Sequence, residues 1–245
     1  MKRPAGQRRP SGIFVTGTDT GVGKTTVAVA LARLCSRRGG VPIPYKPVET
    51  GCDPEPDDAR RLWEAARRPI PLGDVCPFPL ALPVAPAAAA DAAGIRLDLS
   101  KLVRHAFEIA KRGTFLIVEG AGGLLVPYAG RDTNADLAAQ LELPVLVVAR
   151  TALGTINHVA LTLSELGQRR LPVAGVVLVR SGVDIEPQEA TNARLIEQVS
   201  GVAPLGTFPR LNAPDARDPD HLADALEQAL STAALARLLG EAPRD

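Results

Sequence analysis

The stretch GIFVTGTDTGVGKTT, residues 12–26, decides the fold. An apolar run is followed at once by a glycine-bearing loop, then by Gly-Lys-Thr, and then by an amphipathic segment. Glycines in such a loop adopt backbone angles that a Cβ forbids, so their N–H groups can turn inward around an oxyanion. The helix that follows directs the positive end of its dipole to the same point. This order of elements therefore predicts a loop that grips the phosphates of a nucleotide.

Each residue type in this loop suits a different part of a nucleotide. Lys24 would reach the β- and γ-phosphates, and the Thr25 hydroxyl would bind Mg²⁺. The usual pattern has a glycine at the position of Thr18, whereas here the glycine stands one residue earlier, at Gly17, so the loop is a variant. A glycine-rich turn without a ligand is the alternative, and the order of the elements disfavours it. The nucleotide-binding residues predicted in this loop are Asp19, Thr20, Gly21, Val22, Gly23, Lys24, Thr25 and Thr26.

The composition excludes several classes of function. A net charge of +1 gives no basic field for nucleic acid, and 3% aromatic residues argue against surfaces on which bases stack. No apolar run reaches the ~20 residues needed to cross a bilayer. The three cysteines are scattered and odd in number, which disfavours a disulfide framework or a zinc site. We therefore expect a protein of the reducing cytoplasm that contacts neither nucleic acid nor membrane.

Apolar runs alternate with helical patterns along the whole chain. We expect strands at residues 12–16, 41–48, 114–118, 144–149, 173–179 and 205–208. We expect helices at residues 24–38, 57–68, 97–111, 134–141, 157–168, 187–199 and 219–230. Near-continuous apolar strands separated by helices predict an α/β fold, a mainly parallel sheet with helices on both faces, of the P-loop NTPase-like (Rossmann-like) kind. Ligands then collect at the carboxyl ends of the strands.

The chain contains no internal repeat and no linker, which indicates one domain over residues 11–232. A disordered basic leader is expected at residues 1–10 and a C-terminal tail at residues 233–245. Six prolines between Pro69 and Pro86 exclude a regular helix there and predict a loop excursion. This excursion is either a plain surface connection or a lid or interface element.

The residues that follow the strands are the candidates for function. Lys46, beside Pro47, is either a rigidly presented ligand or a solvated side chain. Asp58 opens a helix, where a capping carboxylate and an Mg²⁺ ligand are both reasonable interpretations. Glu119 follows a Phe-Leu-Ile-Val run, the place where a P-loop protein keeps its Mg²⁺-organising acid. The turn at Gly154 opens another helix and is either a second anion site or an ordinary helix start.

Taken together, these segments resemble the dethiobiotin synthetase family. The resemblance spans most of the chain, in the family's order, and Lys-Pro-Val together with Val-Glu-Gly-Ala-Gly-Gly makes it specific. The segments that carry it are GTDTGVGKT at 17–25, YKPVETG at 45–51, Asp58-Ala59, VEGAGG at 118–123, LGTINH at 153–158 and LGTFP at 205–209.

The resemblance implies an ATP-dependent cyclo-ligase of biotin biosynthesis. ATP, CO₂ and 7,8-diaminononanoate give dethiobiotin, ADP and phosphate, with ATP as co-substrate and Mg²⁺ as cofactor. The implied intermediates are a carbamate and a carbamic–phosphoric anhydride. The implied assembly is a homodimer with the active site at its interface, where the turn around Leu153 to Asn157 of the partner subunit holds the substrate's carboxylate tail.

The resemblance also implies roles for individual residues of this sequence. The implied catalytic residues are Lys46, Lys24 and Thr20. The implied metal ligands are Thr25, Asp58 and Glu119. Beyond the phosphate loop, the implied nucleotide-binding residues are Glu119, Gly122, Phe208 and Pro209. The implied substrate-binding residues are Thr50, Lys46, Gly122, Gly123, Leu153, Gly154 and Asn157.

One departure and two rival classes accompany this interpretation. The family often reads adenine with an asparagine at the position matched by Val179, so base recognition differs here. A P-loop switch ATPase of the partitioning or division-site type is the main rival, but such proteins usually carry a lysine at the position of Asp19. Another ATP-dependent ligase or amidotransferase of cobalamin synthesis is the second rival, and such an enzyme usually brings an added glutaminase domain.

Overall fold

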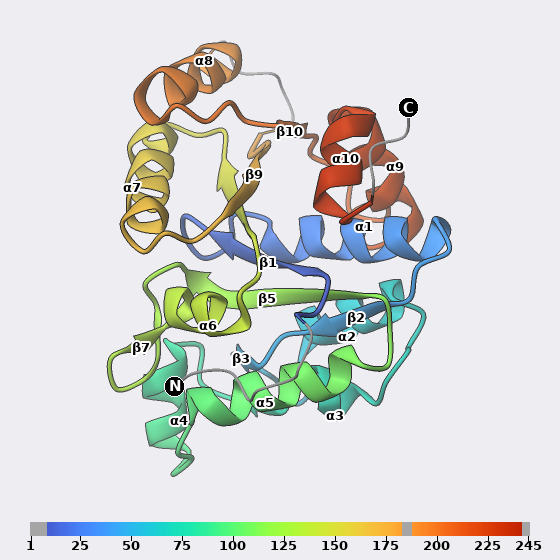
Figure 1. The fold of residues 1–245 in the computed structure, drawn as a ribbon, viewed down its shortest axis with the longest axis vertical. Helices are drawn as coiled ribbons and strands as arrows, with labels where there is room; N and C mark the ends of the chain where they lie inside the picture. The colour runs from blue at the N-terminus through green and yellow to red at the C-terminus, as the bar shows by residue number, and fades with distance from the viewer. Residues whose placement is uncertain (1–8, 183–187, 242–245) are drawn as a thin grey trace.

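A six-stranded parallel sheet forms the centre of the molecule in the computed structural model, which describes residues 9–182 and 188–241 (Figure 1). Every neighbouring pair of strands in this sheet is parallel. The strands, in spatial order, are β10 (Gly206–Phe208), β9 (Val173–Val179), β8 (Val145–Arg150), β1 (Gly12–Gly17), β5 (Phe115–Gly123) and β2 (Pro42–Tyr45). The expected α/β fold is confirmed.

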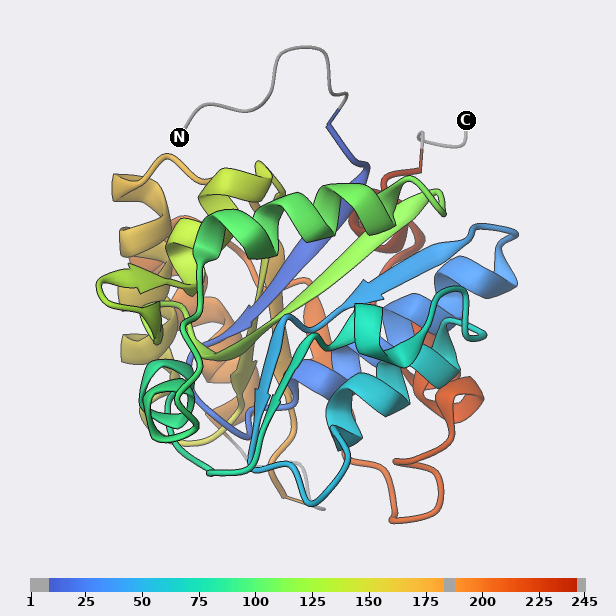
Figure 2. The ribbon, with the colours of Figure 1, turned by 90° about the horizontal axis from the view of Figure 1, so that it is seen from below.

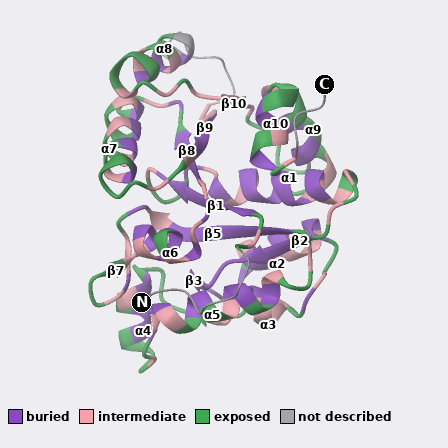
Figure 3. Cartoon of the chain, in the orientation of Figure 1, coloured by how far each residue is buried: buried purple, intermediate pink, exposed green. Residues whose placement is uncertain are grey.

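Helices cover both faces of the sheet and enclose two hydrophobic cores (Figure 2). One face carries α1 (Lys24–Arg37), α9 (Pro219–Ala229) and α10 (Thr232–Leu238), and the other carries α5 (Leu99–Ala110), α6 (Asn134–Leu141), α7 (Thr155–Gln168) and α8 (Gln188–Ser200). Neighbouring strand residues alternate between the cores, since Ile13 and Val15 face α1 whereas Phe14 faces α5. Apart from the edge strand β10, the strands of this sheet are therefore buried along most of their length, and Figure 3 shows the buried residues in purple.

The position of β1 places the phosphate loop at the middle of the sheet edge. Strand β1 lies between β5 and β8, and the loop between β1 and α1 emerges at its carboxyl end. In an open parallel sheet, ligands bind at the carboxyl ends of two adjacent strands whose following connections run to opposite sides of the sheet. The glycine-rich loop is therefore where the topology favours a ligand.

The proline-rich part of the chain is more regular than the sequence predicted. Residues 41–48 were expected to form one strand, but β2 ends at Tyr45 and β3 (Val48–Thr50) begins a separate two-stranded sheet with β4 (Phe78–Leu80). Between them the Lys46 N–H donates to the Val75 carbonyl, 2.9 Å away. Residues 69–86 were expected to be irregular, yet they contain α3 (Leu72–Val75) and β4. Prolines are tolerated in β4 because it lies at an edge.

Two helices and a β-hairpin complete the fold, and the two ends of the chain can be compared with the expected leader and tail. Helix α2 (Asp57–Ala65), which the sequence predicted, lies beside α1. The sequence did not predict α4 (Pro86–Ala92) or the hairpin of β6 (Pro127–Ala129) and β7 (Asp132–Thr133). Residues 233–238 were expected in a tail but belong to α10, whose Leu235 and Leu238 are buried. Residues 1–8 of the expected leader lie outside the described residues. In the described part of the chain, none of the helices is both long and apolar enough to cross a membrane.

Candidate active site

The phosphate loop is already in a conformation that can receive an anion. Gly21 and Gly23 have φ of +69° and +98°, values that favour glycine. Helix α1 begins after Gly23 without a side-chain cap, so its first N–H groups keep their capacity to bind a ligand. The Lys24 ammonium donates to the Asp19 carbonyl, 2.9 Å away, and so arches back over the loop.

A buried carboxylate, Glu119, joins three segments of chain at the edge of the sheet. The Lys46 ammonium donates to Glu119 Oε1 at 2.6 Å, and the Thr25 hydroxyl donates to the same oxygen at 2.8 Å. Lys46 Nζ also lies 3.0 Å from Asp58 Oδ2. Glu119 is completely buried, and a buried carboxylate is unfavourable unless a cation compensates it, which Lys46 does at Oε1. The sequence predicted that Glu119 comes directly after a strand. Strand β5 instead continues to Gly123, so Glu119 lies inside the strand.

The two lysines of the site respond differently to burial. Burial alone lowers the pKa of Lys46, but Glu119 and Asp58 overcome that effect and raise its pKa above the ordinary value. Burial also lowers the pKa of Lys24, and in that case the carboxylates, which are farther away, do not compensate. Asp58 has a lowered pKa, because the nearby Lys46 cation outweighs the effect of its own burial. Lys46 is therefore a permanent cation at neutral pH.

Glu49 is a structural member of the site that the sequence reasoning missed. Its carboxylate accepts hydrogen bonds from the N–H groups of Asp58 at 3.0 Å and Ala59 at 2.9 Å. These bonds cap α2, whose N-cap residue Pro56 provides no side-chain hydrogen bond. Because the capping side chain comes from a different element, the spacing rules for local caps do not find it.

A cavity of about 410 Å³ collects most of the predicted site residues from four separate segments. The predicted residues that line it are Thr20, Gly21, Gly23, Lys24, Thr25, Thr26, Lys46, Thr50, Asp58, Glu119 and Gly122. Glu49, Arg61 and Ala121 also line it and were not predicted. Both lysines thus line one open cavity, next to the loop expected to hold phosphate.

The remaining predicted residues lie outside this cavity. Asp19 and Leu153 line a neighbouring cavity of about 250 Å³, together with Arg150. The other residues that do not line the 410 Å³ cavity are Val22, Gly123, Gly154, Asn157, Phe208 and Pro209. Val179 lies behind the phosphate loop, where a Cβ added to Gly23 would be 3.0 Å from Val179 Cγ1.

Two buried polar side chains, Asn134 and Tyr128, hold the glycine-rich end of β5 in place. The Asn134 amide donates to the Ala121 carbonyl at 2.7 Å and to the Gly123 carbonyl at 2.6 Å. The Tyr128 hydroxyl accepts from the Ala121 N–H at 3.1 Å, and burial raises the pKa of this phenol to about 12. A Cβ on Gly120 would lie only 2.6 Å from Asn134 Oδ1. The glycine at that position allows the amide to approach.

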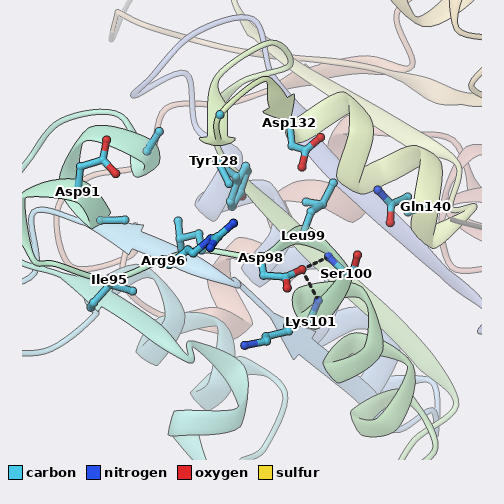
Figure 4. A pocket seen from close by; sticks show the side chains of 15 residues that line it. Asp91, Ile95, Arg96, Asp98, Leu99, Ser100, Lys101, Tyr128, Asp132 and Gln140 are labelled. Atoms are coloured by element: carbon cyan, nitrogen blue, oxygen red, sulfur yellow. Dashed lines mark hydrogen bonds between the residues drawn. The ribbon is translucent and has the colours of Figure 1, made fainter.

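A larger cavity of about 720 Å³ lies elsewhere, along α4 and the start of α5 (Figure 4). Asp91, Arg96, Asp98 and Gln140 line it, as does Tyr128. None of its lining residues was predicted to be functional. The segment from Ala121 to Tyr128 separates the two cavities, because Ala121 lines the smaller one and Tyr128 the larger one.

The fold and the site together define a P-loop nucleotide-binding protein. A family model described as "AAA domain" matches residues 11–217. The chain is 50% identical over 199 residues to the "ATP-dependent dethiobiotin synthetase BioD" of Anaeromyxobacter dehalogenans (strain 2CP-C), covering 81% of this chain and 89% of that relative. It is 41% identical over 202 residues to the same enzyme of Bacillus thuringiensis (strain Al Hakam), covering 81% and 83%. The chain belongs to the ATP-dependent dethiobiotin synthetase family.

Membership of this family confirms the resemblance found in the sequence and makes the protein an ATP-dependent ligase. A solved complex described as "MinC:MinD cell division protein complex, Aquifex aeolicus" superposes with a TM-score of 0.54. It is 15% identical and covers 96% of this chain and 98% of that chain. At that identity the likeness shows a shared fold alone, so it gives no support to the rival switch ATPase.

Proposed function

We propose that this protein closes the ureido ring of dethiobiotin, from 7,8-diaminononanoate, CO₂ and ATP, with ADP and phosphate as the other products. The observation that carries the proposal is the single cavity lined by Lys24, Lys46 and the phosphate loop. A reaction between a carbamate and a triphosphate brings two anions together, and cations at the meeting point reduce their repulsion. The family membership supplies the substrate class.

The first step forms the carbamate. One substrate amine, as its free base, attacks CO₂ through nitrogen, and the proton lost from that nitrogen leaves a carbamate anion. Lys46 cannot serve as the base for this proton at neutral pH, because Glu119 and Asp58 raise its pKa. Its role is that of a fixed positive charge for the carbamate, with Thr20 and Thr50 as hydrogen-bonding neighbours in the cavity.

The second and third steps transfer and release the phosphoryl group. A carbamate oxygen attacks the γ-phosphorus of ATP, the bond to the β–γ bridging oxygen breaks, and ADP leaves. The product of this attack is a carbamic–phosphoric anhydride. The second amine then attacks the carbonyl carbon, phosphate leaves with the electrons of the C–O bond, and a proton is lost from nitrogen. Lys24 offsets the negative charge of the transferred group, and holding the diamine in line supplies much of the rate.

The oxygen atoms around Glu119 suit Mg²⁺. Glu119 Oε2 is buried without a hydrogen-bond partner among the described residues, and the Thr25 hydroxyl and the Asp58 carboxylate face the same space. These are the hard oxygen ligands that Mg²⁺ prefers, and phosphate oxygens and water would complete the set. The described residues contain no group of three histidine, cysteine or acidic side chains placed for a metal. Thr25, Asp58 and Glu119 would hold the ion, which neutralises phosphate charge.

The other substrate contacts fit a homodimer with the active site at the interface. Leu153, Gly154 and Asn157 are exposed, and Leu153 is 96% exposed. In this proposal, the partner's Leu153, the partner's Gly154 and the partner's Asn157 would hold the carboxylate tail, while Gly122 and Gly123 of the first subunit contact the chain of the substrate. The proposed setting is the cytoplasm, with small molecules as ligands and with neither nucleic acid nor membrane as a partner.

Recognition of the nucleobase is the least selective contact of the proposed complex. Val179 stands where the family often has asparagine, and its side chain packs against Gly23. Backbone groups near Phe208 and Pro209 would contact the base instead, which predicts loose selection among nucleoside triphosphates.

The experiment that tests the function is direct. The purified protein is incubated with ATP, Mg²⁺, bicarbonate and the diamine, and the cyclic urea is sought by mass spectrometry with ¹³C-bicarbonate as the label. One ADP is expected for each dethiobiotin, with the label in the ureido carbon. The matched control is the Lys46→Ala variant. A protein that hydrolyses ATP without forming labelled cyclic urea would refute the proposal.

A further inference from the structure

Arg61 is a cationic residue of the active-site cavity that neither the motifs nor the proposed chemistry uses. It lies on α2, three residues after Asp58, so the two side chains project from the same face of that helix. It lines the 410 Å³ cavity together with Thr25 and Thr26, which open α1. One of its terminal nitrogens donates to the Ala216 carbonyl at 3.1 Å, across 155 residues of sequence.

The three cations of this cavity differ in how their charges are already compensated. Lys46 lies within 3.0 Å of two carboxylates, Glu119 and Asp58. Within the described residues, Lys24 and Arg61 contact only main-chain carbonyls, those of Asp19 and Ala216, and neither forms an ion pair. A main-chain carbonyl orients a cation but does not neutralise it. Lys24 and Arg61 are therefore the two cations of the cavity that no carboxylate holds at ion-pair distance, and their interaction with Asp58 acts over a longer range.

The neighbouring Arg60 shows that this is a particular property of Arg61. Arg60 points to the carboxylates of Asp57, at 2.7 Å, and Glu55, at 3.8 Å. It does not line the cavity. In the part of the chain that the structure describes, the Nε of Arg61, like that of Arg60, is buried without a hydrogen-bond partner, but only Arg61 lines the cavity. A buried donor without a partner is unfavourable, and a ligand oxygen in the cavity would satisfy it.

We propose that Arg61 is a further nucleotide-binding residue, whose guanidinium binds phosphate oxygens of ATP from α2, opposite the phosphate loop. A guanidinium presents several N–H groups in a planar fork that matches phosphate, and the bond from one terminal nitrogen to the Ala216 carbonyl restricts the orientation of this fork. The proposal rests on this cavity being the ATP site. It also links the segment after β10, which contains Ala216, to nucleotide binding through one side chain.

The test measures binding with two probes, ATP and inorganic tripolyphosphate, by titration calorimetry in Mg²⁺ without diamine or bicarbonate. For Arg61→Ala we expect the Kd of both probes to rise by about 10- to 100-fold, the scale of losing a charge-assisted hydrogen bond. Arg60→Ala is the matched control, and its Kd values should stay within about twofold of wild type. Thermal unfolding of each variant checks that it is folded.

Two outcomes would overturn the proposal. If Arg61→Ala weakens ATP but leaves tripolyphosphate unchanged, Arg61 acts only by holding the segment around Ala216. If Arg61→Gln, which keeps an amide donor for Ala216 but has no charge, binds both probes as wild type does, no phosphate contact exists. The Gln variant also serves if the Ala variant does not fold. Because these titrations omit the diamine, their failure is distinct from failure of the wild-type protein to make dethiobiotin.

Discussion

The two sides of the active-site cavity hold their lysines in opposite ways. On the phosphate-loop side, residues 17–26, Lys24 contacts only a main-chain carbonyl of its own loop among the described residues. On the acidic side, formed by Lys46, Asp58 and Glu119, the lysine contacts two carboxylates from different elements. Burial accordingly lowers the pKa of Lys24, whereas the carboxylates raise that of Lys46.

This difference separates a side chain used for ligand binding from one that also maintains the fold. Lys24 has no carboxylate at ion-pair distance among the described residues, so its removal should affect ligand binding more than the stability of the fold. Lys46 compensates a fully buried carboxylate, so its removal should lower the stability of the fold as well as the rate of the reaction. The predictions below test this distinction, beginning with the largest expected effect.

Lys46→Ala should abolish most activity and also destabilise the protein. We expect turnover to fall at least ~100-fold, the scale of losing one preorganised charge contact. Glu119 is then left buried without its cation, which should lower the free energy of unfolding by about 3–5 kcal/mol. Steady-state kinetics and urea unfolding measure the two effects. In the double variant Lys46→Ala, Glu119→Gln, stability should largely return while activity stays lost, and continued instability would argue against the pair as its cause.

Lys24→Ala should cost as much activity with little loss of stability. Turnover should again fall at least ~100-fold, because the cation that meets the β- and γ-phosphates is gone. The free energy of unfolding should change by less than about 1 kcal/mol, since a single hydrogen bond to a carbonyl is lost and a buried charge is removed. The same kinetic and urea measurements apply. Equal destabilisation by both lysine variants would remove the distinction between the two sides.

Glu119→Ala should change the metal response. If Glu119 helps hold Mg²⁺, the concentration of Mg²⁺ that gives half-maximal activity should rise by about 10-fold, roughly the effect of losing one charged contact. Titration of Mg²⁺ against the rate of ADP formation measures this. A matched variant on the rim of the fold, Glu55→Ala, should leave the titration curve unchanged. Superimposable curves for wild type and Glu119→Ala would exclude Glu119 as a ligand.

Selection among nucleobases should be loose, and the expected differences in rate are smaller than those of the variants above. We expect kcat/KM for ATP, CTP and GTP to agree within about 10-fold, because Val179 provides no hydrogen-bonding group for a base. Val179→Asn should then favour ATP over the other two nucleotides by several-fold. Competition assays with paired nucleotides measure both ratios. A strong preference for ATP in the wild-type protein would mean that another group reads the base.

Asp58 should contribute a small acid-dependent part of the stability. The folded protein holds the pKa of Asp58 below the ordinary value of 3.8, mainly because Lys46 outweighs the effect of burial. The stabilisation is therefore present above about pH 4 and is lost as the pH falls through the lower folded value. Asp58→Asn should reduce the free energy of unfolding at pH 6 and flatten its decline between pH 4 and pH 3. Urea unfolding over that range measures the slope, and parallel curves for both proteins would contradict this account.

Much of the sheet followed from sequence pattern, because its central strands are buried on both faces. The apolar runs at residues 144–149 and 173–179 predicted β8 and β9 to within one residue, and α6 has the predicted bounds. Elements with weak or mixed patterns were missed, among them α4, α10 and the β6–β7 hairpin. Helix α10 is short, and its cap Ser231 and its buried leucines become informative only once α1 and α9 provide the surface they cover.

The sequence by itself determined the phosphate loop, because glycines, lysine and threonine in one short segment act through near neighbours. It also indicated which residues follow the strands. Only the tertiary structure decided that Lys46 meets Glu119, that Glu49 caps α2, and that Arg61 reaches Ala216. These contacts join residues from 9 to 155 positions apart. They depend on the order of the strands and on how the connections pack, which no local pattern specifies.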